Sequence, residues 1–242
     1  MANLAGHPVI SWTVQRVSLA KRVDRCVVAT STLTGDDDLA RWCKSHSVEV
    51  FRGDPEDVLD RYYQCSLKYE ADHIVRVTGD CPMVDPEIVD RVATLAIDDS
   101  DIDYGTNGEP LTFPEGMTVE IIPQRTLYTA WKESTLPEDR EHVTPFIRFQ
   151  PERFRHGALV SEDDLSNIRL TVDYPDDLSG LTIIMATLNQ RGLLHSFTLQ
   201  DLVQVWNDMP SARDLLNRVD RDLWRNAAMS EYEQADSGLD KS

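Results

Sequence analysis

Short apolar runs alternate with amphipathic segments through the first hundred residues, and this alternation limits the possible folds more than any other feature. The apolar runs have the length and composition of buried strands, and the segments between them have helical spacing. Strands are predicted at 26–30, 48–51 and 73–78, and helices at about 8–21, 36–43, 55–65 and 86–95. Strands that alternate with helices of this length form βαβ units, so a parallel, doubly wound sheet is expected.

The regular alternation of predicted strands and helices ends after residue 100. Residues 112–117 have turn chemistry, and 118–122 alternates like a half-exposed strand. Further helices are predicted near 127–133, 141–149, 177–190 and 198–207, with strands at 156–160 and 168–173. We expect one domain over 1–226, in which an excursion at about 105–160 carries substrate contacts or a subunit interface. The polar, acidic end, 227–242, is predicted to be a disordered tail.

Two carboxylates follow predicted strands directly. Asp80 comes after the run 73–78 and Gly79, and Asp173 ends the run 168–173. Ligands bind at the carboxyl ends of strands in α/β sheets, and carboxylate oxygens suit Mg²⁺. The pair therefore predicts a catalytic Mg²⁺ site beside a phosphate. The competing interpretation is structural: Asp80 caps the turn before the helix at Pro86, and Asp173 caps the helix that begins near Pro175.

Composition excludes several classes of protein. A net charge of −18 disfavours nucleic acid and anionic membranes as partners, since both require basic surfaces. The four cysteines are widely separated, so a disulfide framework or a metal cluster is not expected. The sequence shows no signal peptide and no apolar stretch long enough to span a membrane. We therefore expect a cytoplasmic protein.

Several ordered blocks resemble one family of enzymes. The blocks are 28–30, 50–53, 57–63, 75–82, 140–145 and 170–178. They resemble the cytidylyltransferase family named after spore coat polysaccharide biosynthesis protein F, which is similar to the enzymes that make CMP-sialic acid and CMP-Kdo. The likeness covers roughly residues 4–210.

The resemblance implies a Rossmann-like, GT-A-like nucleotidyltransferase fold, a three-layer α/β/α arrangement with a mostly parallel sheet. It implies transfer of CMP from CTP to a sugar or sugar acid for surface polysaccharide or glycoconjugate biosynthesis, with release of pyrophosphate. Mg²⁺ would lie at Asp80 and Asp173, and the enzyme would be a homodimer.

The remaining site residues are assigned on the same basis. Nucleotide contacts are expected from Thr30, Arg61, Thr78 and Gly79, and substrate contacts from Glu115, Glu120 and His142. Arg52 and Arg76 are further possible phosphate partners, and for Arg76, which lies inside a predicted strand, a salt bridge is an equal alternative. For Thr30 a turn role, for Arg61 a surface role and for His142 a structural hydrogen bond remain open alternatives.

The chain departs from the family at its start. The family usually opens with another strand and a triphosphate loop rich in Arg, Gly, Pro and Lys, whereas residues 4–8 resemble the segment after that loop. The chain is therefore expected to be N-terminally truncated relative to the family. Three explanations stay open: a longer natural protein, a catalytically inactive relative that acts as a binding or partner subunit, or a second subunit that supplies the missing part.

Overall fold

Four amphipathic helices form in the first hundred residues, where the sequence predicts them. The computed structural model describes residues 1–218, so the predicted tail at 227–242 lies outside the described residues. Carboxylates start two of the helices: Asp57 accepts a hydrogen bond from the N–H of Asp60, and Asp85 from that of Glu87. The helices are α1 (Val9–Ser18), α2 (Asp37–Ser45), α3 (Val58–Lys68) and α4 (Pro86–Ile97).

Within residues 1–218 the strands form three separate sheets. A short hairpin pairs β1 (Asn3–Leu4) with β2 (His7–Pro8), and β3 (Val27–Ser31) runs parallel to β4 (Glu49–Gly53). The largest sheet has the order β5-β7-β6-β8. Its strands are β5 (His73–Arg76), β6 (Tyr104–Thr106), β7 (Glu120–Pro123) and β8 (His156–Ala158). The α/β class is confirmed.

Strand β7 makes the largest sheet mixed, because it runs antiparallel to both β5 and β6. It returns from β6 without a crossover helix, which is what a parallel connection needs. All four of its residues are buried. The prediction of a half-exposed strand here was wrong, because Ile121 and Ile122 point to opposite faces of the sheet and each packs in its own hydrophobic cluster.

The second half of the chain is mainly helical. The predicted helix at 141–149 is broken, because Val143 has a φ of 73° and the N–H of Thr144 bonds to the carbonyl of His142. Pro145, which has no N–H, then starts a new helix. Helix α10 and strand β6 were not predicted. The helices are α5 (Gln124–Glu133), α6 (Pro137–His142), α7 (Pro145–Arg148), α8 (Pro175–Gln190), α9 (Leu199–Asp208) and α10 (Pro210–Leu216).

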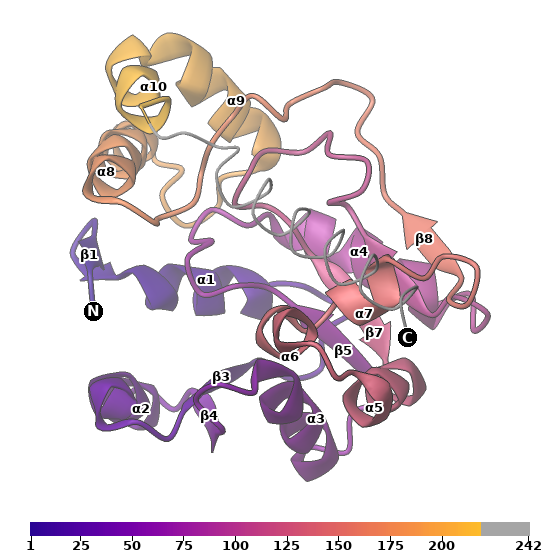
Figure 1. The fold of residues 1–242 in the computed structure, drawn as a ribbon. Helices are drawn as coiled ribbons and strands as arrows, with labels where there is room; N and C mark the ends of the chain where they lie inside the picture. The colour runs from indigo at the N-terminus through magenta and orange to yellow at the C-terminus, as the bar shows by residue number, and fades with distance from the viewer. Residues whose placement is uncertain (219–242) are drawn as a thin grey trace.

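These elements form layers (Figure 1). Helices α8, α9 and α10 gather at one end of the molecule, α1 lies between them and the β3–β4 sheet, and α2 and α3 flank that sheet. Gly180 allows α10 to approach α8, since a Cβ at this position would lie 2.6 Å from the Cγ of Leu216. Within residues 1–218, no helix is both long enough and apolar enough to cross a membrane.

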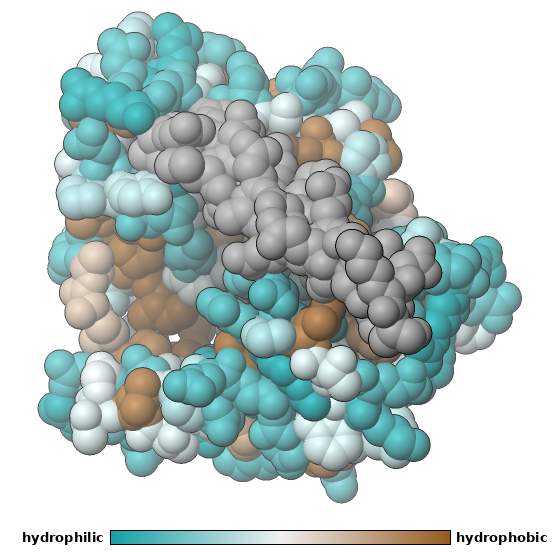
Figure 2. All heavy atoms as spheres, in the orientation of Figure 1, coloured by the Kyte–Doolittle hydropathy of each residue, from teal (hydrophilic) through white to brown (hydrophobic). Residues whose placement is uncertain are grey.

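Strands β3 and β5 each pair on one edge only within the described residues. Figure 2 shows an opening through the molecule at the left, between the positions that α1 and α2 occupy in Figure 1, with apolar residues on its border. Val75 in β5 and Val77 just after its end are half-buried, although both pack against the main core. The β3–β4 pair and the β5-β7-β6-β8 sheet are therefore not joined into one continuous sheet within the described residues.

Candidate active site

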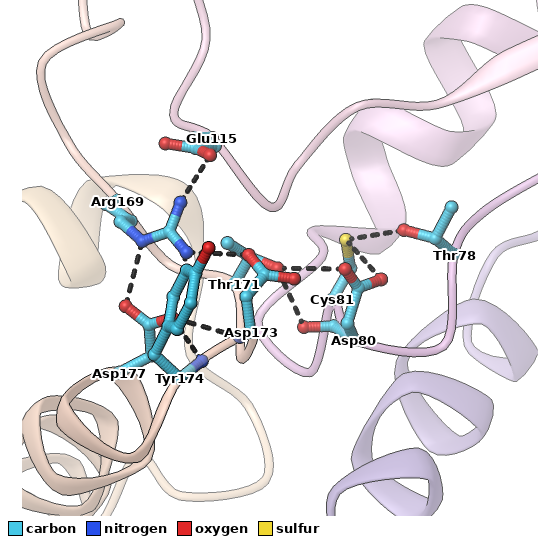
Figure 3. A network of polar contacts seen from close by, with 9 residues as sticks. All are labelled: Thr78, Asp80, Cys81, Glu115, Arg169, Thr171, Asp173, Tyr174 and Asp177. Atoms are coloured by element: carbon cyan, nitrogen blue, oxygen red, sulfur yellow. Dashed lines mark hydrogen bonds and ion pairs between the residues drawn. The ribbon is translucent and has the colours of Figure 1, made fainter. Parts of the chain in front are cut away.

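The main chain joins Asp80 to the segment that carries Asp173. Asp80 lies in the turn after β5, where the N–H of Cys81 bonds to the carbonyl of Thr78. The N–H of Val172 donates to the carbonyl of Asp80 at 3.0 Å, and the Thr171 hydroxyl donates to its carboxylate at 3.1 Å. Asp173 follows Val172 immediately, so the two acidic side chains lie close together (Figure 3).

Neither carboxylate caps a helix in the way that the structural interpretation required. Asp85 is the N-cap of α4, and Tyr174 is the N-cap residue of α8. The N–H groups of Asp173 and Tyr174 both donate to Asp177, in the first turn of α8, at 2.9 Å. Asp80 and Asp173 are therefore not needed to begin these two helices.

Residues 168–173 are extended but do not form the predicted strand. Only Arg169 makes a ladder contact, an isolated parallel bridge to Glu115. The N–H of Glu115 donates to the carbonyl of Ile168, and the N–H of Leu170 donates to the carbonyl of Glu115. Because the segment's hydrogen bonds go to two different loops, at Glu115 and at Asp80, no regular ladder develops.

Gly116 is what allows the first of these loops to approach so closely. Its φ is +89°, and an added Cβ would lie 2.6 Å from the carbonyl carbon of Leu170. Only glycine adopts this conformation without strain and leaves room for the neighbouring backbone. The loop at Glu115–Gly116 thus fixes the segment at Ile168 and Leu170, and Asp80 fixes it two residues further on, at Val172.

A buried arginine connects the acidic residues. The side chain of Arg169 is 2% exposed, and its Nε and Nη2 donate to the two carboxylate oxygens of Asp177 at 2.8 Å each. Nη2 also donates to Asp173 at 2.6 Å, and Nη1 to Glu115 (Figure 3). The sequence analysis missed Arg169 and Asp177. A charged residue inside an apolar run was the available signal, since a buried charge needs partners.

The electrostatics of this cluster favour a cation. Burial raises the pKa of Asp173, and the nearby charge of Asp80 raises it further, against the opposing effect of Arg169. For Asp177, burial is outweighed by the hydrogen bonds from Arg169 and the main chain, so its pKa is lowered. One guanidinium thus faces Asp173, Asp177 and Glu115, and Asp80 adds a fourth carboxylate beside them.

The acidic pair matches the donor set of a magnesium site. Mg²⁺ in enzymes typically binds one or two carboxylates and completes its shell with water and substrate phosphates. Across residues 1–218 no group of three or more His, Cys, Asp or Glu side chains is arranged to hold a metal. Asp80 and Asp173 therefore fit a cation that is shared with a substrate, rather than one held by an all-protein cage.

Cys81 is next to Asp80, but its surroundings do not favour the reactive thiolate that a nucleophile needs. Burial raises the pKa of its thiol strongly, and the charge of Asp80 adds to the effect. The sulfur lies 3.1 Å from the Thr78 hydroxyl and 3.7 Å from an Asp80 oxygen. A thiol with a raised pKa carries little thiolate, which is the reactive form.

The structure places the residues assigned to the nucleotide in two regions. Thr78 and Gly79 lie in the Asp80 turn, and the carbonyl of Gly79 accepts a bond from the Thr13 hydroxyl of α1. Thr30, at the end of β3, is buried and its hydroxyl donates to Asp36 at 2.7 Å. Arg61 donates to the carbonyls of Asp54 and Pro55, so part of its guanidinium is used by the loop before α3.

The residues assigned to the substrate differ in exposure. Glu115 faces Arg169 at the edge of the acidic cluster, and His142 is exposed at the end of α6. Glu120 is buried in β7, where it accepts hydrogen bonds from Arg76, Tyr104 and Thr144. Its oxygens are thus engaged by the protein, and a direct substrate contact by Glu120 stays a prediction that the geometry does not favour.

Solved structures of known proteins share this architecture. A mixed α/β sheet flanked by helices is the nucleotidyltransferase fold of the proteins that this chain resembles in structure. The chain shares this fold with CMP:2-keto-3-deoxy-manno-octonic acid synthetase solved with CTP, at a TM-score of 0.59 and 16% identity over 77% of this chain and 90% of that one.

The chain belongs to the cytidylyltransferase family, whose model matches residues 1–180. A solved cytidylyltransferase from Leptospira borgpetersenii is 30% identical, with a TM-score of 0.83 over 90% of each chain. Spore coat polysaccharide biosynthesis protein SpsF of Bacillus subtilis is 31% identical over 193 residues, which are 78% of this chain and 77% of that protein.

Proposed function

We propose that this protein transfers CMP from CTP to a hydroxyl group of a sugar or sugar acid. The hydroxyl oxygen forms a bond to the α-phosphorus of CTP and loses its proton. The bond from the α-phosphorus to the oxygen that bridges the α- and β-phosphates breaks, and pyrophosphate leaves with that oxygen. The observation that carries this proposal is the pairing of Asp80 and Asp173 through the Val172 hydrogen bond, in a chain of the cytidylyltransferase family.

Asp80 and Asp173 are the residues that would hold Mg²⁺. When bound, the ion neutralises phosphate charge and polarises the reacting oxygens. The chain's own contribution is positioning, because the bonds from Thr171 and Val172 to Asp80 fix the two carboxylates relative to one another. The turn that contains Thr78 and Gly79 lies beside them and would contact the nucleotide, with Thr30 and Arg61 on the β3 side.

The acceptor is proposed to be a sugar or sugar acid of a surface polysaccharide or glycoconjugate. This rests on the family and on relatives such as the spore coat polysaccharide protein and the 3-deoxy-manno-octulosonate cytidylyltransferases. Glu115, beside the acidic pair, and the exposed His142 are the proposed acceptor contacts. The acid group of a sugar acid would favour His142 over Glu115, since like charges repel.

Pyrophosphate release tests the proposal. The chain is supplied with CTP, Mg²⁺ and a panel of sugars and 2-keto sugar acids, and released pyrophosphate is measured. Release that requires the acceptor, CTP and Mg²⁺ together supports the proposal. ATP, GTP and UTP serve as controls for the base. No acceptor-dependent release over background across the panel contradicts it.

One structural observation supports a second candidate function, that of a binding subunit that binds CTP without catalysing its reaction. The three arginines that the sequence offered for the phosphates are all engaged within the protein. Arg52 donates to the carbonyls of Ser31 and Leu33 and to Asp37, Arg61 donates to loop carbonyls, and Arg76 pairs with Glu120. Calorimetric binding of CTP with Mg²⁺ in the absence of any pyrophosphate release would favour this candidate over the enzyme.

The sequence suggested an isologous dimer interface over the strand at 118–122 and the helices after it, and self-association is proposed here through the helices alone. Strand β7 is inside the sheet and is not available to a second copy. The exposed aromatic residues Tyr128 of α5 and Phe149, just after α7, offer apolar area instead. We expect a homodimer that buries them. Light scattering at high micromolar concentration tests this, and a monomer mass would contradict it.

A further inference from the structure

Arg169 contacts both the buried start of α8 and the solvent-exposed side of the acidic pair. Its own side chain is 2% exposed and that of Asp177 is 0% exposed, whereas that of Asp173 is 42% exposed. The guanidinium therefore extends from the interior toward the candidate metal site (Figure 3). A residue placed in this way can transmit the rigidity of the core to an exposed carboxylate.

The interior contact fixes the plane of the guanidinium. Two parallel hydrogen bonds of 2.8 Å join Nε and Nη2 to the two oxygens of Asp177. Asp177 is itself held by the N–H groups of Asp173 and Tyr174 at the start of α8. Bidentate pairing of this kind sets orientation as well as energy. The directions of the remaining N–H groups of Arg169 are consequently fixed.

One of those N–H groups determines where the Asp173 carboxylate lies. Nη2 donates to Oδ2 of Asp173 at 2.6 Å, while Oδ1 accepts no hydrogen bond from the described residues. Without Arg169 a side chain as exposed as that of Asp173 would sample several rotamers. With it, one oxygen is held and the other is free to bind a ligand beside Asp80.

We propose that Arg169 is a positioning residue, which holds the Asp173 carboxylate in the orientation that binds a divalent cation together with Asp80. The inference rests on the proposed function, because it concerns the same metal site. Partners behind the ligands of a metal are generally worth 10- to 100-fold in metal affinity. The alternative is that Arg169 only neutralises Asp177 and stabilises the fold, with no effect on a cation.

The test measures Mn²⁺ affinity directly, by electron paramagnetic resonance of the free ion, on the full chain without substrate. Arg169→Lys keeps the positive charge near Asp177 but cannot make two parallel bonds and also reach Asp173. Arg191→Lys is the matched control, since Arg191 forms a 2.7 Å pair with Asp208 at the other end of α8. Circular dichroism establishes that each variant is folded.

The expected result is a loss of about 10- to 100-fold in Mn²⁺ affinity for Arg169→Lys, with no change for Arg191→Lys. A purely structural role would lower the melting temperature and leave the Mn²⁺ affinity of the folded protein unchanged, and that outcome overturns the inference. If Arg169→Lys does not fold, Asp177→Asn replaces it. This variant loosens the guanidinium while keeping one oxygen acceptor, and wild-type Mn²⁺ affinity in it overturns the inference equally.

The two proposals fail in different ways. If the wild-type chain shows no saturable Mn²⁺ site, the metal site of the proposed function is overturned, and this inference with it. If the wild type binds Mn²⁺ and the Arg169→Lys variant binds it equally well, only the positioning role is overturned. Pyrophosphate release with CTP and an acceptor reports on the reaction separately from either result.

Discussion

The carbonyl oxygen of Asp80 accepts a hydrogen bond from the N–H of Val172 at 3.0 Å, although the two residues are far apart in the sequence. This bond sets the distance between the turn after β5 and the segment that leads into α8. Because Asp173 follows Val172 directly, the bond also places two carboxylates side by side. The predictions below concern this relationship and the contacts that maintain it.

Replacing either carboxylate by its amide should abolish catalysis without unfolding the protein. Asp80→Asn and Asp173→Asn keep side-chain size but remove the charge that binds a cation. We expect pyrophosphate release to fall by more than about 100-fold, beyond the usual cost of losing an outer partner of a metal ligand. Asp176→Asn is the control, since the Asp176 side chain is 44% exposed and lies 3.4 Å from Arg218. Equal activity in all three variants would contradict a catalytic role for the pair.

Gly116→Ala should destabilise the protein more than an alanine at another glycine of positive φ. At Gly116 an added Cβ meets the backbone of Leu170 at 2.6 Å, whereas at Gly192, with a φ of +73°, nothing lies within 4 Å. Gly192→Ala should cost only the left-handed conformation, about 1–2 kcal/mol. Gly116→Ala should cost clearly more, and should also impair activity by displacing the segment of Asp173. Thermal melting compares the two, and equal shifts would argue against the close approach.

Glu120→Gln should strongly destabilise the fold at neutral pH. Glu120 is 4% exposed and pairs with Arg76, so the amide leaves a buried guanidinium without its counter-ion. Breaking a buried pair in this way costs about 3–5 kcal/mol. Glu133→Gln, which breaks an exposed 2.6 Å pair with Arg153, should cost about 0.2–1 kcal/mol. Urea unfolding at pH 7 measures both, and a small effect for Glu120→Gln would contradict the buried ion pair.

The same pair predicts a pH dependence. Burial alone would raise the pKa of Glu120, but Arg76 and the hydrogen bonds of Tyr104 and Thr144 outweigh it, so the pKa is lowered. A carboxyl group with a lowered pKa in the folded state contributes stability above its unfolded pKa of about 4.3. That contribution is lost as the pH falls through the folded value. The stability difference between wild type and Glu120→Gln should therefore shrink as the pH falls below about 4. A difference that is constant from pH 7 to pH 3 would contradict this.

Cys81 should be dispensable for the chemistry and unreactive in the folded protein. Burial raises the pKa of its thiol, and Asp80 raises it further. Iodoacetamide at pH 7.5 should modify Cys81 only after denaturation, as peptide mass spectrometry would show. Cys81→Ala should retain pyrophosphate release within a few-fold. Rapid alkylation under native conditions, with loss of activity, would show instead that the thiol is exposed and takes part.

The four helices of the first hundred residues and the parallel β3–β4 pair could be predicted from the sequence, because their signals are local. Apolar spacing and the caps at Asp57 and Asp85 mark where chain segments begin. The failures were at positions decided by distant contacts. Residues 168–173 have a strand-like composition, yet their partners are two loops, at Glu115 and at Asp80. Strand β7 alternates in the sequence, but Ile121 and Ile122 point to opposite faces and each is buried in a hydrophobic cluster built from distant residues.

The candidate site was predictable in part for the same reason. Asp80 and Asp173 could be found because each follows an apolar run, where ligands bind in α/β folds. Their proximity depends on the main-chain hydrogen bond between Val172 and Asp80, which cannot be predicted from a local sequence pattern. Asp177 accepts the N–H groups of Asp173 and Tyr174 at the start of α8 and anchors Arg169, and this role was likewise not predicted, because the sequence offered Asp173 as the helix cap.

A double-mutant cycle on Mn²⁺ affinity tests the central claim most directly. Mn²⁺ dissociation constants are measured for the wild type, Asp80→Asn, Asp173→Asn and the double variant. If both carboxylates bind one cation, each single variant loses most of the affinity and the double variant loses little more than either, so the effects are not additive. Wild-type affinity in either single variant, or two losses that simply add, would contradict a cation shared between Asp80 and Asp173.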